Sequence, residues 1–575
     1  MIQAIQGRDG VDDESDDDMS PTSLHCSPSE AFDLSFYFFD KYRKDTISSG
    51  SCLRALLDQL ASTPDRRRYA LDLYSLIRNG KHTKPLKSSD EDVADMLRLM
   101  LQVGGQCLLV IDGLDECDQP DAHLMALMKL AESSLQTRIA IFSRPSVLLP
   151  RSLDSKSLIL DLKSTHNSND ITSFLRPQIR DLLELYGFLD LNELAEVVKN
   201  TLLRAEGMFL WARLLMSYLR SPSLTNRDRQ DAIENLCRLE GLDSLFSAIL
   251  ENLAKSLSGK AKENVKKLFG WVTVAARPLK PQELAAAVGI PLDRASTSHD
   301  NIPQLERFIG VMSGALLEIG TNGTVRFAHL SVRDFLTSAR SGPSPAKSEF
   351  EISPLQVHLR VAYACLSYLH HTVPSEPLSG SSQVIPDPDH QRKRFPVLEY
   401  AVQFWPNHVS KFCMSFLETK LEMNEPQLQE FSRMFVDTIH NKAMMSLWIE
   451  AAWMFGTPPS FGTLPELLAF TSKNNPLPKS SKDVFFAASQ YLKDFEAELA
   501  LLESSWSRVL KDSPNEIWEP SINAFSTARF WKSFGGSKVK PIAQNNVKRR
   551  DMVLLQSQVS DTGDRLGVLR VKPPA

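Results

Sequence analysis

The sequence has few of the features that mark secreted or membrane proteins. Its seven cysteines lie singly, and no two have the Cys-x-x-Cys spacing of a zinc site or a redox dithiol. The most apolar stretches, 107–111 and 208–216, are too short to span a bilayer. The amino terminus is acidic, which is not the pattern of a secretory signal. These absences predict a cytoplasmic protein that does not enter a membrane.

An excess of positive charge is also missing. Lysine and arginine number 65 against 70 aspartates and glutamates, and the net charge is -5. Nothing in this balance favours nucleic acid as a partner. The basic cluster at 548–550 is short, and we interpret it as part of a solvated tail.

Short apolar runs alternate with helical patterns in the first part of the chain. The runs at 34–39, 107–111 and 138–142 read as buried strands, and a further short run follows at 158–160. Helical periodicity lies between them, near 50–60, 90–101 and 121–133. This alternation indicates a parallel sheet with helices on its faces.

The rest of the chain is mainly helical. The exception is a predicted strand pair at 315–319 and 324–328, joined by a Gly-Thr-Asn-Gly turn whose residues tolerate positive φ. Three helices with such a hairpin are the composition of a winged helix.

The run LLVIDGLDE at 108–116 is the strongest candidate for chemistry. A strand that ends in Asp112 places a carboxylate at the carboxyl edge of the sheet, where open α/β sheets bind ligands. A Walker B aspartate has this position and holds magnesium directly or through water. Asp115 and Glu116, just beyond, could polarise an attacking water. The other interpretation is a buried strand followed by a solvated acidic turn.

A second candidate is Arg144, in the Ser-Arg-Pro sequence that ends the next strand. An arginine at that edge could reach a γ-phosphate and sense it. The alternative is a surface arginine before a proline that ends the strand.

Together with EGMFLWA at 206–212, these two motifs resemble the NACHT module of fungal STAND proteins, which is close to the nephrocystin-type NTPase domain. RPLKPQEL at 277–284 and FAHLSVRDFL at 327–336 resemble the winged helix that follows it, of the GPI inositol-deacylase type. LEYA at 398–401, with Trp405 and His408, resembles the helical segment beyond.

The resemblance implies roles for individual residues. Asp112 would ligate Mg²⁺, Asp115 or Glu116 would support hydrolysis, and Arg144 would sense the γ-phosphate of ATP. His329 is similar to the winged-helix histidine that contacts the phosphate of ADP. A hydrogen-bonded histidine at a strand-to-helix junction is its other interpretation.

The phosphate-binding loop is missing from this sequence. Such a loop needs Gly-x-x-x-x-Gly-Lys-Ser/Thr between a strand and a helix, because its backbone N–H groups wrap the phosphates. The pair Gly80-Lys81 has Ser75 in place of the first glycine and His82 in place of the hydroxyl residue. We therefore expect either a truncated form of a longer protein or a degenerate relative, inactive as an ATPase as given.

The fold class predicted is α/β plus mainly α: a partial P-loop-type parallel-sheet domain, followed by helical and winged-helix domains. The predicted parts are a disordered acidic segment (1–31), the partial NACHT domain (32–165), a helical domain (166–258), the winged helix (259–345), a helical region (346–535) and a poorly ordered tail (536–575).

The resemblance predicts an NLR-like signalling NTPase that switches with ATP and ADP and forms homo- or hetero-oligomers with related STAND proteins. The alternative is a non-catalytic regulator that acts on intact relatives. DNA binding through the winged helix is the least favoured function, because Arg333 stands beside Asp334 and the face is not basic.

Overall fold

The structure is a computed structural model, and the chain divides after Asp161 into two compact units, each of which is described by itself. Most of the predicted segments 1–31 and 536–575 lies outside the described residues. The structure describes residues 33–40, 46–62, 64–79, 89–103, 105–144, 147, 158–160, 166–188, 190–239, 241–291, 302–338, 349–419, 425–474, 479–518, 552–559 and 565–571.

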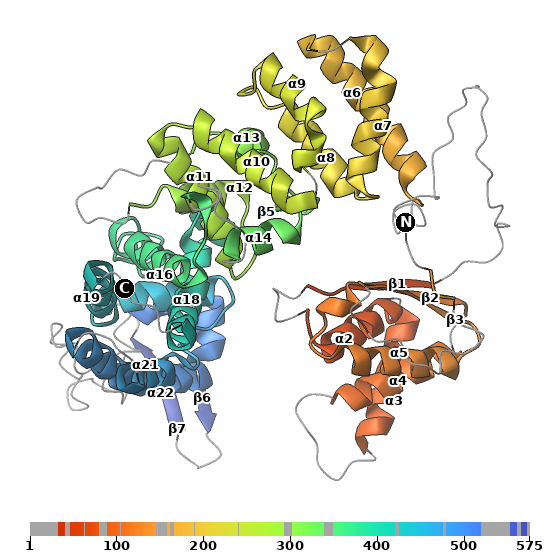
Figure 1. The fold of residues 1–575 in the computed structure, drawn as a ribbon. Coiled ribbons are helices and arrows are strands. Elements are labelled where there is room, and N and C mark those ends of the chain that lie inside the picture. The colour runs from red at the N-terminus through yellow and green to blue at the C-terminus, as the bar shows by residue number, and fades with distance from the viewer. Residues whose placement is uncertain are drawn as a thin grey trace. The chain divides into compact units, whose positions relative to one another are not determined.

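The first unit is a parallel three-stranded sheet in the order β1-β2-β3 with helices packed against it (Figure 1). The predicted fold class is confirmed. The elements of the unit are β1 (Asp33–Phe38), α2 (Ser49–Leu60), α3 (Pro64–Asn79), α4 (Asp90–Val103), β2 (Cys107–Asp112), the 3₁₀ turn η1 (Leu114–Glu116), α5 (Pro120–Ser133) and β3 (Thr137–Phe142).

The two faces of this sheet differ. Figure 1 shows α2, α4 and α5 together on one face, and Leu109 and Ile111 of β2 are fully buried beneath them. Residues opposite each other in a parallel register share a face, so Phe38, Asp112 and Phe142 belong to the other one. Phe38 is 50% exposed and Phe142 is 40% exposed. The described helices of this unit therefore cover one face, not both as predicted.

The short run Leu158–Leu160 is not a strand. Its three residues have no regular structure and are 81%, 59% and 73% exposed. Three apolar residues are too few to decide between a strand and an exposed segment, because only pairing with a neighbouring strand would stabilise them.

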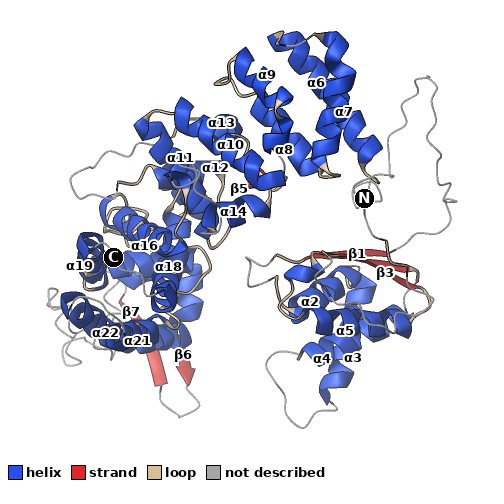
Figure 2. Ribbon diagram, viewed as in Figure 1, coloured by secondary structure: helices blue, strands red, loops and turns tan. Residues whose placement is uncertain are grey.

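The second unit consists mainly of helices (Figure 2). Its first helices are α6 (Ser168–Tyr186), α7 (Leu194–Ala205), α8 (Phe209–Leu219), α9 (Asn226–Glu234) and α10 (Gly241–Ser256), with 3₁₀ turns η2 (Leu191–Glu193) and η3 (Leu236–Leu239). The apolar stripe of α8 is buried: Trp211 and Leu215 have no exposed surface, and the indole of Trp211 donates to Leu239 O at 2.8 Å.

The winged helix follows, with its hairpin where the sequence places it. Strands β4 and β5 pair antiparallel, Leu317 opposite Phe327, and Gly323 N donates to Gly320 O at 2.9 Å in the turn. Gly323 has a φ of 73°, which explains the glycine. The elements are α11 (Gly259–Val274), α12 (Pro281–Val288), α13 (Leu305–Met312), β4 (Leu317–Ile319), β5 (Val325–Phe327) and α14 (Leu330–Thr337).

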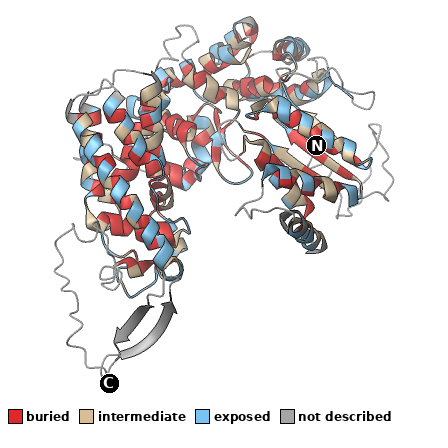
Figure 3. Ribbon diagram, turned by 90° about the horizontal axis from the view of Figure 1, so that it is seen from below, coloured by how far each residue is buried: buried red, intermediate tan, exposed pale blue. Residues whose placement is uncertain are grey.

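The remaining helices share one apolar core with the winged helix, and their buried stripes are visible in Figure 3. None of the helices in the described ranges is long and apolar enough to cross a membrane. The elements are α16 (Pro354–His371), α17 (Pro388–Arg394), α18 (Leu398–Thr419), α19 (Glu425–Ile439), α20 (Lys442–Met454), α21 (Leu464–Asn474), α22 (Lys479–Asp512), the 3₁₀ turn η4 (Pro514–Trp518), β6 (Met552–Val559) and β7 (Arg565–Val571). Strands β6 and β7 pair as an antiparallel hairpin, which the sequence interpretation did not predict.

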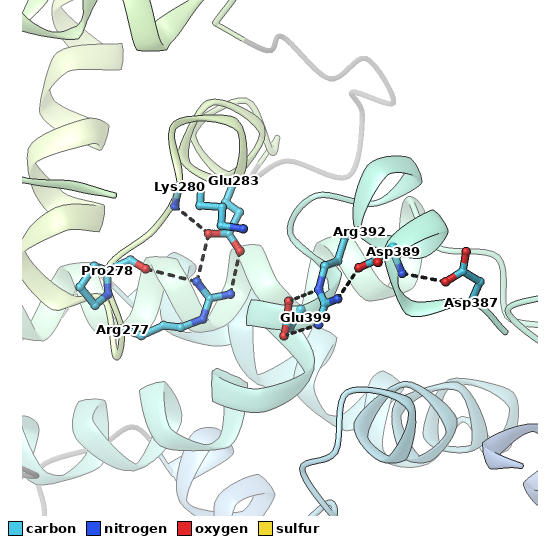
Figure 4. Close-up of polar contacts among 8 residues, drawn as sticks. All are labelled: Arg277, Pro278, Lys280, Glu283, Asp387, Asp389, Arg392 and Glu399. Atoms are coloured by element: carbon cyan, nitrogen blue, oxygen red, sulfur yellow. Dashed lines mark hydrogen bonds and ion pairs between the residues drawn. The ribbon is translucent and has the colours of Figure 1, made fainter. Parts of the chain in front are cut away.

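Two polar networks lie near the junction of the winged helix and α18 (Figure 4). Arg277 holds Glu283 with two hydrogen bonds of 2.7 and 3.0 Å, and its guanidinium lies 5.5 Å from the ring centre of Tyr400. The buried hydroxyl of Tyr400 accepts from Ala276 N at 2.9 Å. In the second network Arg392 pairs with Glu399. These contacts join the start of α12 to α18 in one packed body.

A buried carboxyl group joins three segments further along. Glu450 of α20 has no exposed surface, and its Oε2 accepts from Leu378 N at 3.0 Å and from the indole of Trp518 at 2.8 Å. Burial raises the pKa of Glu450 to about 7, while the two hydrogen bonds oppose the rise. Glu450 thus ties η4 and the segment around Leu378 to α20.

Candidate functional site

The three parallel strands end side by side at one edge of the sheet, and the acidic motif lies there. Asp112 is the last residue of the central strand, in register with Phe38 and Phe142. Phe39 N donates to Asp112 O, and Gly113 N donates to Phe142 O, at 2.9 and 3.0 Å. The edge is therefore held by backbone hydrogen bonds on both sides of Asp112.

Gly113 turns the chain from the strand into η1. Its φ is 72°, and a Cβ built on it would lie 3.2 Å from the carbonyl oxygen of Phe39. A residue with a side chain is disfavoured there by both the backbone conformation and the space. The turn buries Leu114 and brings Asp115 back over the end of the sheet.

Asp115 contacts the end of β3 directly. Its Oδ1 accepts from Arg144 N at 3.1 Å and from Ser143 Oγ at 3.4 Å. Its Oδ2 lies 3.6 Å from Arg144 Nε. The side chain of Asp115 is 10% exposed, whereas that of Arg144 is 59% exposed. Asp115 therefore acts as a bridge between the two motifs, and Arg144 keeps most of its guanidinium in solvent.

The position of Asp112 favours a cation. Partial burial raises the pKa of Asp112, the hydrogen bond from Gly113 opposes the rise, and the negative charge of Asp115 adds to it. A bound cation would relieve this repulsion. Among the described residues, no group of three or more His, Cys, Asp or Glu side chains could hold a metal ion.

The carboxylates at this edge of the sheet therefore fit Mg²⁺ only as part of a nucleotide site. In such sites one or two carboxylates contribute, and phosphate oxygens and water complete the octahedron. Asp112 can supply one ligand. Phosphate oxygens, when bound, would supply the remaining negatively charged ligands of the metal.

His329 lies in the second unit, at the start of α14. Its Nδ1 accepts from Ser331 N at 3.1 Å and contacts Ser331 Oγ at 2.8 Å, so the ring caps the helix. Because Nδ1 accepts a backbone hydrogen bond, the neutral ring carries its proton on Nε2. Its predicted contact with ADP stays a prediction. The structure brings Asp112, Asp115, Glu116 and Arg144 together in one unit.

Sequence reasoning did not single out Ser143 or His123. His123 of α5 is buried, its Nδ1 contacts Ser49 Oγ at the start of α2, and burial lowers its pKa to about 4. Nearby, Asp118 N donates to Ile47 O at 3.0 Å. These contacts fix the turn that follows η1, and no local pattern in the sequence marks them.

Comparison with known proteins identifies two of the domains. Residues 20–144 match the family model of the nephrocystin 3 N-terminal domain, and residues 251–353 match that of the GPI inositol-deacylase winged helix domain. These two matches support a NACHT/STAND-type protein. The first match includes the acidic run and Arg144, and the second includes the motifs at 277–284 and 327–336; the motifs at 206–212 and 398–401 lie outside both.

Among solved structures, a Signal Transduction ATPase with Numerous Domains (STAND) protein with a tetratricopeptide repeat sensor from Pyrococcus horikoshii is similar to this chain. The identity is 13%, the TM-score is 0.29, and the match covers 87% of this chain and 81% of that one. No curated protein matches the chain.

Proposed function

We propose that this NACHT/STAND-type protein is an NLR-like signal-transduction NTPase, a switch that responds to ATP and ADP at the carboxyl edge of its sheet. In this proposal Asp112 is a ligand of Mg²⁺, Arg144 senses the γ-phosphate, and Glu116 supports hydrolysis. It acts in the cytoplasm, in oligomers with related STAND proteins. Five cysteines have free thiols, which supports a reducing compartment: Cys52, Cys107, Cys117, Cys365 and Cys413.

The contact between Asp115 and the end of β3 is the observation that carries this proposal. It couples the acidic turn to Ser143 and Arg144 through two hydrogen bonds and one ion pair. The ion pair itself is long, at 3.6 Å, and half open to solvent, so it is weak. A phosphate oxygen can form a charge-assisted bond with the same guanidinium.

The switch we propose is therefore an exchange of partners by Arg144. Without a γ-phosphate, its guanidinium stays near Asp115. With one, the guanidinium moves to the phosphate, and Asp115 keeps only its hydrogen bonds with Ser143 Oγ and Arg144 N. Asp115 thus orients the sensor, and we assign the hydrolytic role to Glu116. Mg²⁺, when bound, would neutralise phosphate charge beside Asp112.

Nucleotide binding by the full chain tests this function. We expect saturable binding of a fluorescent ADP or ATP analogue in Mg²⁺, weakened at least about tenfold by Asp112→Ala and unaffected by Asp121→Ala. Asp121 is the matched control, because it is an exposed acid in the first turn of α5. When EDTA removes Mg²⁺, the wild-type chain and Asp112→Ala should bind the analogue with equal affinity. A folded chain with no saturable binding would overturn the proposal.

The absence of Gly-x-x-x-x-Gly-Lys-Ser/Thr from the sequence favours a second candidate, a non-catalytic regulator of intact relatives. Co-purification with a full-length STAND relative, unchanged by nucleotide and by Asp112→Ala, would support this function. Loss of that association on Asp112→Ala would instead support the switch.

A further inference from the structure

The first unit contains a cavity far from the acidic edge. Its volume is about 290 Å³, and it lies where β1 and β2 begin, opposite the edge that carries Asp112. The ends of α2 and α4 and the start of β2 supply apolar lining, including Leu60, Met100 and Cys107. Small-molecule sites combine mostly apolar walls with a few polar groups.

The two charged side chains that line the cavity form an ion pair with each other. Arg66 of α3 pairs with Asp33 of β1, with 2.6 Å between the guanidinium nitrogen and the carboxylate oxygen. The hydrogen bond from Arg66 to this carboxylate is the main reason that the pKa of Arg66 is raised. The carboxylate of Asp33 would repel an anionic ligand, and the guanidinium of Arg66 would repel a cationic one. The remaining polar lining residue is Tyr69, which is neutral.

We propose that this cavity binds an uncharged, mainly apolar small molecule. At the roughly 30 Å³ that one water molecule occupies in the liquid, the space corresponds to roughly ten water molecules, which is the size of a small organic molecule. One hydroxyl or N–H group on the molecule finds an acceptor in Asp33. The inference does not rest on the proposed nucleotide switch, because the cavity lies at the other end of the strands.

Gly105 offers a way to block the cavity. It lines the cavity, and a Cβ built on it has no heavy atom within 4 Å. A Cβ at this position displaces no neighbour, and a phenylalanine adds a bulky ring to the lining of the cavity. Gly259, the first residue of α11, also has no heavy atom within 4 Å of a Cβ and gives a matched control in the other unit.

The test uses indole and indole-3-acetate, an uncharged and an anionic probe of similar shape, with the full chain in calorimetric titrations. We expect saturable binding of indole, at least about tenfold weaker binding of the acetate, and loss of indole binding in Gly105→Phe but not in Gly259→Phe. Hydrogen exchange of the wild-type chain should show indole protecting the segments around Leu60 and Met100.

Absence of saturable indole binding, preference for the anion, or protection confined to other segments would each overturn the proposal. The hydrogen-exchange measurement keeps the proposal testable if Gly105→Phe does not fold.

Discussion

Asp115 is the residue for which the structure adds most to the sequence interpretation. The sequence offers it as a partner of water in hydrolysis, an equal alternative to Glu116. In the structure its two oxygens face Ser143 and Arg144. A carboxylate whose two oxygens are occupied by Ser143 and Arg144 is less free to contact a water molecule. Glu116 is therefore the acid that we assign to hydrolysis.

Gly113 gives a prediction at the same scale. We expect Gly113→Ala to lower the free energy of unfolding of the first unit by about 2 kcal/mol or more, since the left-handed conformation alone costs about 1–2 kcal/mol. The close approach of Phe39 O, at 3.2 Å, adds to this. Denaturant unfolding of the wild-type chain and of Gly113→Ala measures this loss of unfolding free energy.

Gly187→Ala is the control for this prediction. Gly187 also has a positive φ, 61°, but a Cβ there meets nothing within 4 Å. Its substitution should cost less. An equal cost at the two sites would show that the contact with Phe39 contributes nothing.

Single residues were predicted well where the pattern is local. Asp112 at the end of its strand follows from an apolar run that stops at an acid. The bridge from Asp115 to Ser143 was not predicted, because its partners are 28 residues apart and meet only when two strands lie side by side. The roles proposed for Asp112, Glu116, Arg144 and His329 stay predictions.

At the scale of elements, periodicity located most helices and strands of the first unit within two residues. The predicted hairpin is confirmed, because its turn glycines and flanking strands all favour the same structure. The run Leu158–Leu160, which the sequence interpretation left unassigned, has no regular structure, because a short apolar run carries no information about whether a partner strand exists. The one-sided cover of the sheet was not predicted, because the alternation of strands and helices does not show which face each helix covers.

Helix α20 supports a prediction about pH. The folded pKa of Glu450 is about 7 against a usual value of 4.5, so unfolding releases its proton between these values. The stabilising effect of this group is fully present below pH 4.5 and is lost as the pH rises through about 7. The loss amounts to roughly 3 kcal/mol at pH 8. Glu450→Gln removes the ionisation while keeping the shape.

We therefore expect Glu450→Gln to raise the midpoint of denaturant unfolding at pH 8 and to change it little at pH 5. Unfolding curves at the two pH values check this. Replacement of Glu516, a partly exposed acid on η4, should leave the pH dependence as it is. If Glu450→Gln lost the same amount of stability at pH 5 and at pH 8, the prediction would be contradicted.

At the scale of the whole molecule, the division after Asp161 is the main feature. Each unit has its own apolar core, one around Leu97 and Ile111 and the other around residues such as Leu447 and Trp211. Separate cores can unfold in separate transitions, so a single free energy need not describe this chain.

We expect Leu97→Ala to shift one unfolding transition and Leu447→Ala the other. Both side chains have no exposed surface, and each substitution should cost about 2–5 kcal/mol in its own unit. Calorimetric scans, with near-ultraviolet circular dichroism as a second probe, would resolve the two transitions. A single transition moved equally by both variants would show that the units unfold together.

The register of β1 has a consequence for synthesis on the ribosome. Asp33 pairs with Cys107 and Phe38 with Asp112, and three helices separate the strands. At the usual rates of elongation, the aromatic segment of β1 leaves the ribosome about 4 to 15 s before its partner. Throughout that interval its Phe-Tyr-Phe-Phe sequence lacks β2, the strand with which it pairs in the described part of the fold. An aromatic segment exposed in this way is the kind of surface that chaperones cover during synthesis.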